Sequence, residues 1–117
     1  MSFIRRKEEV PVENKKMFGG AGEAENRKIL LGAEEMGGKG RLFNHVVLRP
    51  GCGIGPHVHH GDSETYYFLK GRGEYSDNGV VRTVKPGDVT WTPDGSSHGV
   101  ENKGDTELTF MALIINS

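Results

Sequence analysis

The hydrophobic positions of this chain fall into short runs that recur at close intervals from residue 42 onward. Runs of this length between Gly, Pro and Asn residues are typical of β-strands. Residues 74–84 predict a hairpin, because Asn78-Gly79 is the dipeptide that a type I′ turn prefers. The remaining runs predict strands over residues 42–51, 64–71, 88–95 and 108–115, with a further short strand from residue 97 to 102.

The first 40 residues carry a weaker pattern. Short strands could form near residues 3–4, 10–12 and 29–31, and the glycine-rich residues 19–22 predict a loop. A weak helical possibility extends over residues 22–31. We therefore expect an N-terminal arm with short strands, residues 1–40, followed by one domain, residues 41–117. Short strands with turn signals this close together favour an all-β sandwich or barrel.

Composition supports that expectation and narrows the function classes. Glycine makes up 18 of 117 residues, about twice its usual ~7% share, which suits a chain with many turns.

The net charge of −1 argues against nucleic acid as a partner. The longest clean apolar run, residues 110–115, is far shorter than the roughly 20 residues of a membrane span. The N-terminus lacks the apolar core of a secretory signal. The single cysteine, Cys52, suits a reducing compartment, so a cytoplasmic protein is expected.

Candidate chemistry is concentrated in the stretch GPHVHHGDSE, residues 55–64. In a strand, alternate side chains share a face, so His57 and His59 can bind one metal ion while His60 points away. A carboxylate would complete the group. Glu64 opens the next strand and is preferred over Asp62, which lies inside the tight turn.

A fourth ligand must come from another part of the chain, and His45 and His98 are the remaining histidines. His98 follows a Pro-Asp-Gly turn and leads into a strand, which gives it a rigid position. His45 lies in the middle of a strand, where either face is possible. The alternation pattern alone leaves this choice open.

Two motifs resemble those of the cupin superfamily. Gly51-x5-His57-x-His59-x4-Glu64-x6-Gly71 is similar to the first cupin motif, and Gly87-x5-Pro93-x-Gly95-x2-His98-x3-Asn102 is similar to the second. Every marked position is present, and the 15 residues between the motifs match the spacing of small single-domain cupins.

The resemblance implies a double-stranded β-helix, or jelly-roll barrel, with His57, His59, Glu64 and His98 as the metal ligands. It also implies a homodimer. Three imidazoles and one carboxylate suit several divalent transition metals; Mn or Fe is favoured, and Zn, Ni or Co is possible. Four protein ligands on a six-coordinate ion leave two adjacent positions open for a small molecule.

Other residues could line such a site. Counting by twos from Glu64 places Tyr66 on the same face, where it could donate a hydrogen bond to a metal-bound ligand, and we take it as a candidate catalytic residue. It could equally fill the barrel. An anion would favour an inward cation, and among Arg41, Arg49, Lys70 and Arg82 only Lys70 shares the parity of Glu64.

The sequence therefore supports more than one function. The main expectation is a metal-dependent enzyme of the cupin type, with dioxygenase, decarboxylase, lyase or isomerase chemistry on a small oxygenated substrate. The alternative is non-catalytic, metal-dependent binding or sensing of a small chelating anion such as an oxalate-like dicarboxylate. A vestigial site in a structural protein is the third possibility.

Overall fold

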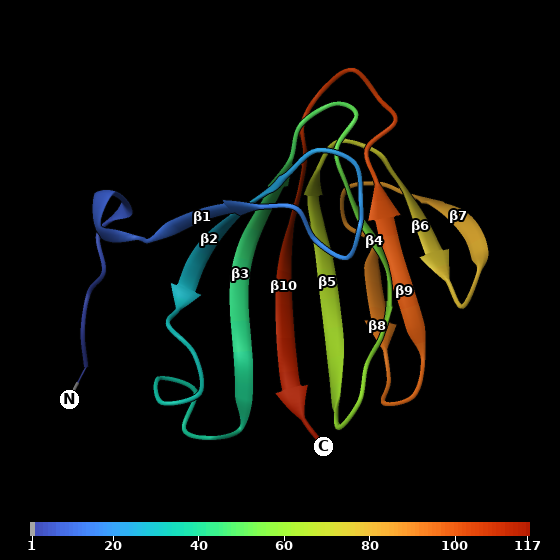
Figure 1. The fold of residues 1–117 in the computed structure, drawn as a ribbon. Coiled ribbons are helices and arrows are strands. Elements are labelled where there is room, and N and C mark those ends of the chain that lie inside the picture. The colour runs from blue at the N-terminus through green and yellow to red at the C-terminus, as the bar shows by residue number, and fades with distance from the viewer. Residues whose placement is uncertain (1) are drawn as a thin grey trace.

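The computed structural model describes residues 2–117 and shows two antiparallel β-sheets packed face to face (Figure 1). One sheet has six strands in the order β1-β2-β3-β10-β5-β8, and the other has four in the order β4-β9-β6-β7. This architecture confirms the predicted all-β jelly roll. The elements are a 3-10 helix η1 (Lys7–Glu9) and strands β1 (Val12–Lys15), β2 (Ala24–Leu30), β3 (Gly40–Leu48), β4 (Gly53–Val58), β5 (Asp62–Lys70), β6 (Gly73–Asp77), β7 (Val80–Val84), β8 (Val89–Thr92), β9 (Ser97–Glu101) and β10 (Leu108–Asn116).

Strict alternation of apolar residues on the central strands builds the core between the sheets. On β5, Tyr66 and Phe68 are buried. The alternate residues, Tyr67 and Leu69, are exposed. The same period of two holds on β10 from Phe110 to Ile114, as a pleated strand requires. The inward set from both sheets forms one cluster that includes Val46, Leu48, Ile54, Tyr66, Phe68, Tyr75, Val100, Leu108, Phe110 and Ala112.

The predicted strands from residue 42 onward correspond to β3 and β5–β10. The hairpin prediction is confirmed: β6 pairs with β7 across Asn78 and Gly79, which both have positive φ angles, 48° and 87°. Among two-residue hairpin turns, only type I′ places both central residues at positive φ angles.

The first 40 residues depart from expectation in places. Residues 24–30 form strand β2 and no helix, and Phe3 and Ile4 lie outside any strand. The helix-favouring residues Ala, Glu, Arg, Lys and Leu between 22 and 31 are overridden by backbone pairing of β2 with β3, because tertiary pairing commonly outweighs intrinsic propensity.

Strands β1 and β2 extend the six-stranded sheet beyond β3, and the chain between them returns to the opposite sheet. We call residues 16–23 the bridging loop. Met17 in this loop forms a parallel bridge with Ile54 of β4, so the loop spans one side of the sandwich (Figure 1). Within residues 2–117, no helix has the length and apolar character needed to cross a bilayer.

Candidate metal centre

Three strands and one turn bring four potential ligands together at one end of the core. His57 of β4 and His98 of β9 are partners in register within the four-stranded sheet. Glu64 faces them from β5 of the other sheet. His59 follows β4, and its backbone is fixed to the turn before β9, since its N–H donates to Ser96 O (3.0 Å) and its C=O accepts from Gly95 N (2.7 Å).

The four ligand atoms converge on a single point. One nitrogen or oxygen atom from each of His57, His59, Glu64 and His98 lies within 4.8 Å of all the others. Glu64 Oε1 is 3.1 Å from His59 Nε2 and 3.0 Å from His98 Nε2. His98 Nε2 is also 3.1 Å from the Nε2 atoms of both other histidines.

The opposite ring nitrogen of each histidine has its own partner, which fixes the orientation of the ring. His57 Nδ1 donates to Gly55 O (2.9 Å), and His59 Nδ1 donates to Asp62 Oδ1 (2.6 Å). His98 Nδ1 lies 2.8 Å from the hydroxyls of both Tyr75 and Thr92. Gly55 O and the Asp62 carboxylate can only accept, so the Nδ1 atoms of His57 and His59 carry a proton, and in the neutral rings Nε2 presents its lone pair to the centre.

The donor set fits a divalent transition metal. The three imidazole nitrogens and the carboxylate oxygen lie within 4.8 Å of one another, and unprotonated atoms at this spacing repel each other unless a cation lies between them. Adjacent ligands on an octahedral ion with bonds of about 2.1 Å are about 3 Å apart, close to the spacing of His98 Nε2 from its three neighbours. Metal-binding histidines also characteristically donate their second N–H to a carboxylate, carbonyl or other polar group.

The electrostatics of Glu64 agree with a cationic centre. Burial by itself raises the pKa of this carboxyl group, but hydrogen bonding to the three histidines outweighs burial and holds the pKa far below its usual range. Glu64 is 5% exposed, and a buried carboxylate requires positive charge beside it. Protons on the histidines or a bound cation can supply that charge.

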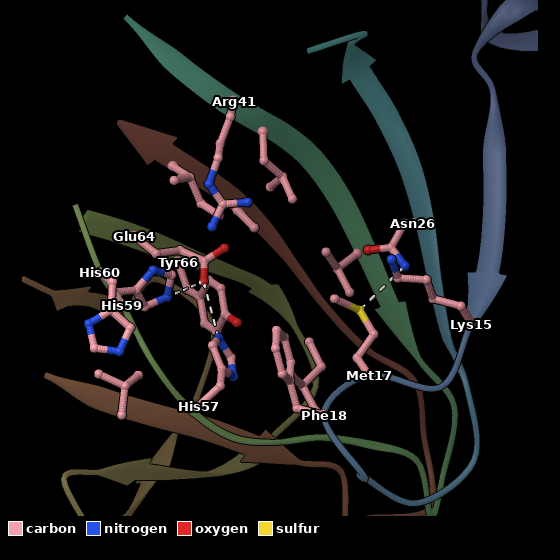
Figure 2. A pocket seen from close by; sticks show the side chains of 16 residues that line it. Lys15, Met17, Phe18, Asn26, Arg41, His57, His59, His60, Glu64 and Tyr66 are labelled. Carbon is pink, nitrogen blue, oxygen red and sulfur yellow. Dashed lines mark hydrogen bonds and ion pairs between the residues drawn. The ribbon is translucent and has the colours of Figure 1, made fainter. Parts of the chain in front are cut away.

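A cavity of about 360 Å³ opens next to the cluster, and Figure 2 shows His57, His59, Glu64 and Tyr66 directed to its inner end. The ring of Tyr66 stacks on His98, with centroids 4.8 Å apart. Burial, and next the charge of Glu64, raise the pKa of Tyr66 well above its ordinary value. Its hydroxyl therefore stays protonated at neutral pH and is able to donate a hydrogen bond.

Two residues that the sequence analysis ranked behind others, Asp62 behind Glu64 and Arg41 behind Lys70, support the cluster. Asp62 orients His59 through Oδ1, and its Oδ2 accepts a hydrogen bond from Arg41 Nε at 2.8 Å. Arg41 also lines the cavity. The alternation of side chains along a strand identified neither role, because Arg41 and Asp62 are 21 residues apart in sequence and meet only in the folded chain.

The other residues singled out from the sequence lie outside the cluster. His60 is exposed at the edge of the cavity. His45 is on the outer face of β3, opposite the buried Asn44. Lys70 is exposed at the end of β5 and does not line the cavity, so the expectation of an inward Lys70 is wrong. Asn102 has a structural role: its Nδ2 donates to Leu48 O and Thr106 O, both at 2.8 Å.

Comparison with known proteins gives a match to the cupin domain family over residues 44–114. An oxalate-binding protein from Thermotoga maritima is 45% identical over 112 residues, which cover 96% of this chain and 92% of the relative.

Two solved structures illustrate the similarity of the fold. A crystal structure of a predicted oxalate decarboxylase, also from Thermotoga maritima, superposes with a TM-score of 0.92 at 42% identity and covers 98% of this chain and 100% of its own. The Schizosaccharomyces pombe Cnp3 cupin domain superposes with a TM-score of 0.73 at 12% identity, over 92% of this chain and 69% of its own. The second similarity concerns the fold alone.

Proposed function

The chain belongs to the cupin family, and from that premise we propose that it binds a small chelating anion, such as an oxalate-like dicarboxylate, through one divalent metal ion. The observation that carries the proposal is the convergence of four ligand atoms within 4.8 Å beside a cavity. The oxalate-binding relative supports the choice of ligand. We propose His57, His59, Glu64 and His98 as the metal ligands.

Mn or Fe is our proposed metal, and the three-nitrogen, one-oxygen donor set accommodates Zn, Ni or Co as well. When bound, such an ion supplies two adjacent coordination positions that a bidentate dicarboxylate can occupy. Asp62 holds His59 in the orientation that this site requires, and Tyr75 and Thr92 do the same for His98.

Two side chains are placed to contact the bound anion directly. Arg41 Nε donates a hydrogen bond to Asp62 Oδ2. In the described part of the chain, the two terminal NH2 groups of Arg41 have no acceptor. These groups can donate to the carboxylate oxygens that the metal leaves free. We propose Tyr66 as the second donor, on the opposite side of the cavity from solvent.

The second candidate function is decarboxylation of such an anion, which the similarity to the predicted oxalate decarboxylase favours. Release of carbon dioxide from oxalate needs delivery of a proton to the remaining carbon to give formate. Of the residues that line the cavity, Glu64 is already used by the proposed metal site, and His60, which could deliver a proton, is exposed to solvent at the edge of the cavity. The binding function needs no such proton donor, so we place it first.

Isothermal titration of Mn-loaded protein with oxalate tests the proposal. We expect saturable binding that disappears after treatment with a chelator and returns when Mn is added back. The His59→Ala variant should lose both metal and oxalate, whereas the matched His60→Ala variant should keep both. Absence of oxalate binding to the metal-loaded protein contradicts the proposal, and formation of formate, followed by NMR, would instead establish the second candidate.

We also propose a homodimer that forms through the outer face of the six-stranded sheet. Tyr67 and Leu69 on β5 lie beside Val89 and Trp91 on β8, in the register Tyr67↔Val89. All four are at least 43% exposed, and Trp91 is 64% exposed. A contiguous apolar surface of this kind marks an interaction site more often than a free surface. A cytoplasmic location stays a prediction.

A further inference from the structure

The cavity beside the metal cluster is larger and more apolar than an oxalate anion requires. Its volume is about 360 Å³, whereas oxalate is equivalent to roughly three water molecules, or about 90 Å³. Beyond the cluster and Arg41, much of the lining is hydrophobic, and Figure 2 shows Met17 and Phe18 on the side away from Arg41. The hydrophobic lining residues are Met17, Phe18, Leu42, Val46, Ile54, Val58, Ala112 and Ile114.

The wall formed by Met17 and Phe18 is held firmly in place. The bridging loop accepts two hydrogen bonds from β4: Gly53 N donates to Ala21 O (2.8 Å), and Gly55 N donates to Met17 O (3.0 Å). The approach is so close that a Cβ on Gly55 would lie 1.9 Å from Phe18 O. Glycine is therefore required at residue 55 for the loop to reach the cavity.

Phe18 itself is in an unfavourable conformation. Its φ angle is 52°, and its side chain is 58% exposed, yet its ring stacks on His57 with centroids 3.9 Å apart and an interplanar angle of 13°. A non-glycine residue with this backbone conformation is strained, because its Cβ comes too close to the following carbonyl oxygen. Strain of this kind is concentrated at ligand-binding sites, and here it holds an aromatic ring over a proposed metal ligand.

We infer that the physiological ligand is a 2-oxo carboxylate with an apolar side chain of about three to five carbon atoms. This inference rests on the proposed function and narrows it. The carboxylate and the adjacent oxo oxygen form the chelating head, which faces the metal ligands and Arg41. The tail lies against Phe18, Met17 and Ile54, where its burial removes apolar surface from water on both sides.

A distal charged group suits this cavity less well. Lys15 also borders it, but its side chain is 57% exposed and lies 3.8 Å from Glu13 Oε1. A second carboxylate among the apolar side chains would lose its hydration without gaining a buried partner. We therefore expect 2-oxoglutarate to bind more weakly than the uncharged-tail acid of similar length, 2-oxohexanoate.

The test is isothermal titration of Mn-loaded protein with pyruvate, 2-oxobutanoate, 2-oxopentanoate and 2-oxohexanoate, with oxalate as reference. We expect affinity to rise about threefold to fourfold for each added methylene group. In the Phe18→Asn variant, the increase in affinity per methylene, measured relative to the variant's own affinity for pyruvate, should fall to at most about twofold. Asn tolerates the positive φ angle, so the loop should keep its conformation.

Phe3→Asn is the matched control, because Phe3 is 56% exposed and lies outside the cavity lining; it should leave the series unchanged. An affinity that does not change with chain length, while oxalate still binds, overturns this inference and leaves the proposed function intact. Tighter binding of 2-oxoglutarate than of 2-oxohexanoate, or an undiminished increase in Phe18→Asn, also overturns it. Failure of every carboxylate to bind overturns both.

Discussion

Hydrogen bonds to the far side of the imidazoles orient the nitrogen atoms that we propose as metal ligands. Gly55 O and Asp62 Oδ1 accept from the Nδ1 atoms of His57 and His59, so the inward nitrogens are left as acceptors. Such partners behind a ligand commonly contribute 10-fold to 100-fold to metal affinity. The specificity of the centre is therefore distributed over residues that do not touch the ion themselves.

Tyr66 gives a prediction at this scale. Tyr66→Phe removes one hydroxyl from the inner end of the cavity and keeps the ring that stacks on His98. If the hydroxyl donates to the bound anion, oxalate affinity should fall by about 10-fold, which corresponds to one hydrogen bond to a charged group. Metal content should not change. Calorimetry with oxalate and metal analysis of the same samples check both parts, and an unchanged oxalate affinity would show that Tyr66 only fills the barrel.

The cluster could be predicted from sequence, but its surroundings could not. His57, His59 and Glu64 follow from the period of a strand and the turn after it, and similarity to the second cupin motif added His98. Arg41 and Phe18 give no such local signal. They reach the cavity because β3 and the bridging loop pack against distant strands, and that proximity appears only in the folded chain.

At the level of elements, pairing between neighbouring strands decides the structure of the N-terminal region. Residues 24–30 have a composition that favours helix, yet they form β2 because β3 offers an edge to pair with. From β3 onward, turn residues delimit the strands clearly, and sequence predicted those elements well. The weak alternation before residue 40 explains why the same reasoning located only parts of β1 and β2 there, near residues 12 and 29–30.

The ion pairs of Glu25 predict how this region responds to pH. On β2, its carboxylate accepts from Arg27 Nε (2.6 Å) and from Arg49 NH2 (2.9 Å). The hydrogen bond from Arg49 is the largest influence and lowers the pKa of Glu25, against the opposing effect of burial. A carboxyl group with a lowered folded-state pKa stabilises the protein above its unfolded pKa of about 4.5, and this contribution is lost as pH falls through the folded-state value.

Glu25→Gln should therefore reduce the free energy of unfolding at pH 7 by less than about 1 kcal/mol, since both arginines are partly exposed. The difference from wild type should shrink as the pH falls below about 4.5. Urea unfolding at pH 7 and at pH 3 measures it. Glu13→Gln serves as the control, because Glu13 makes only a long exposed pair with Lys15. A difference that grows on acidification would contradict this account.

For the whole molecule, the two faces of the six-stranded sheet have different roles. The inner face carries the core and one side of the candidate metal centre, and the outer face of β5 and β8 exposes Tyr67, Leu69, Val89 and Trp91. A second copy of the chain is the partner that we propose for this outer face. Since none of these residues lines the cavity, assembly would leave the cavity mouth open.

Trp91→Ser tests that assembly. We expect the wild-type protein to have twice the chain mass of 12.8 kDa in size-exclusion chromatography with light scattering, and the variant to shift to the single-chain mass, because Trp91 is the largest exposed side chain of the face. Val81→Ser, an equally exposed position on β7 of the other sheet, should leave the mass unchanged. A wild-type mass of 12.8 kDa, or a variant that stays dimeric, contradicts the proposed interface.

The four proposed ligands belong to both sheets, and His57 and His98 are 41 residues apart in the chain. The complete set of four exists only after both layers have closed on each other, because Glu64 comes from the opposite sheet. The proposed ion therefore gains its full affinity only in the folded chain, where it would link the two layers. We therefore expect the apoprotein to be folded, with a lower free energy of unfolding than the metal-loaded protein. Which ion it binds should depend on the metals available to the folded protein.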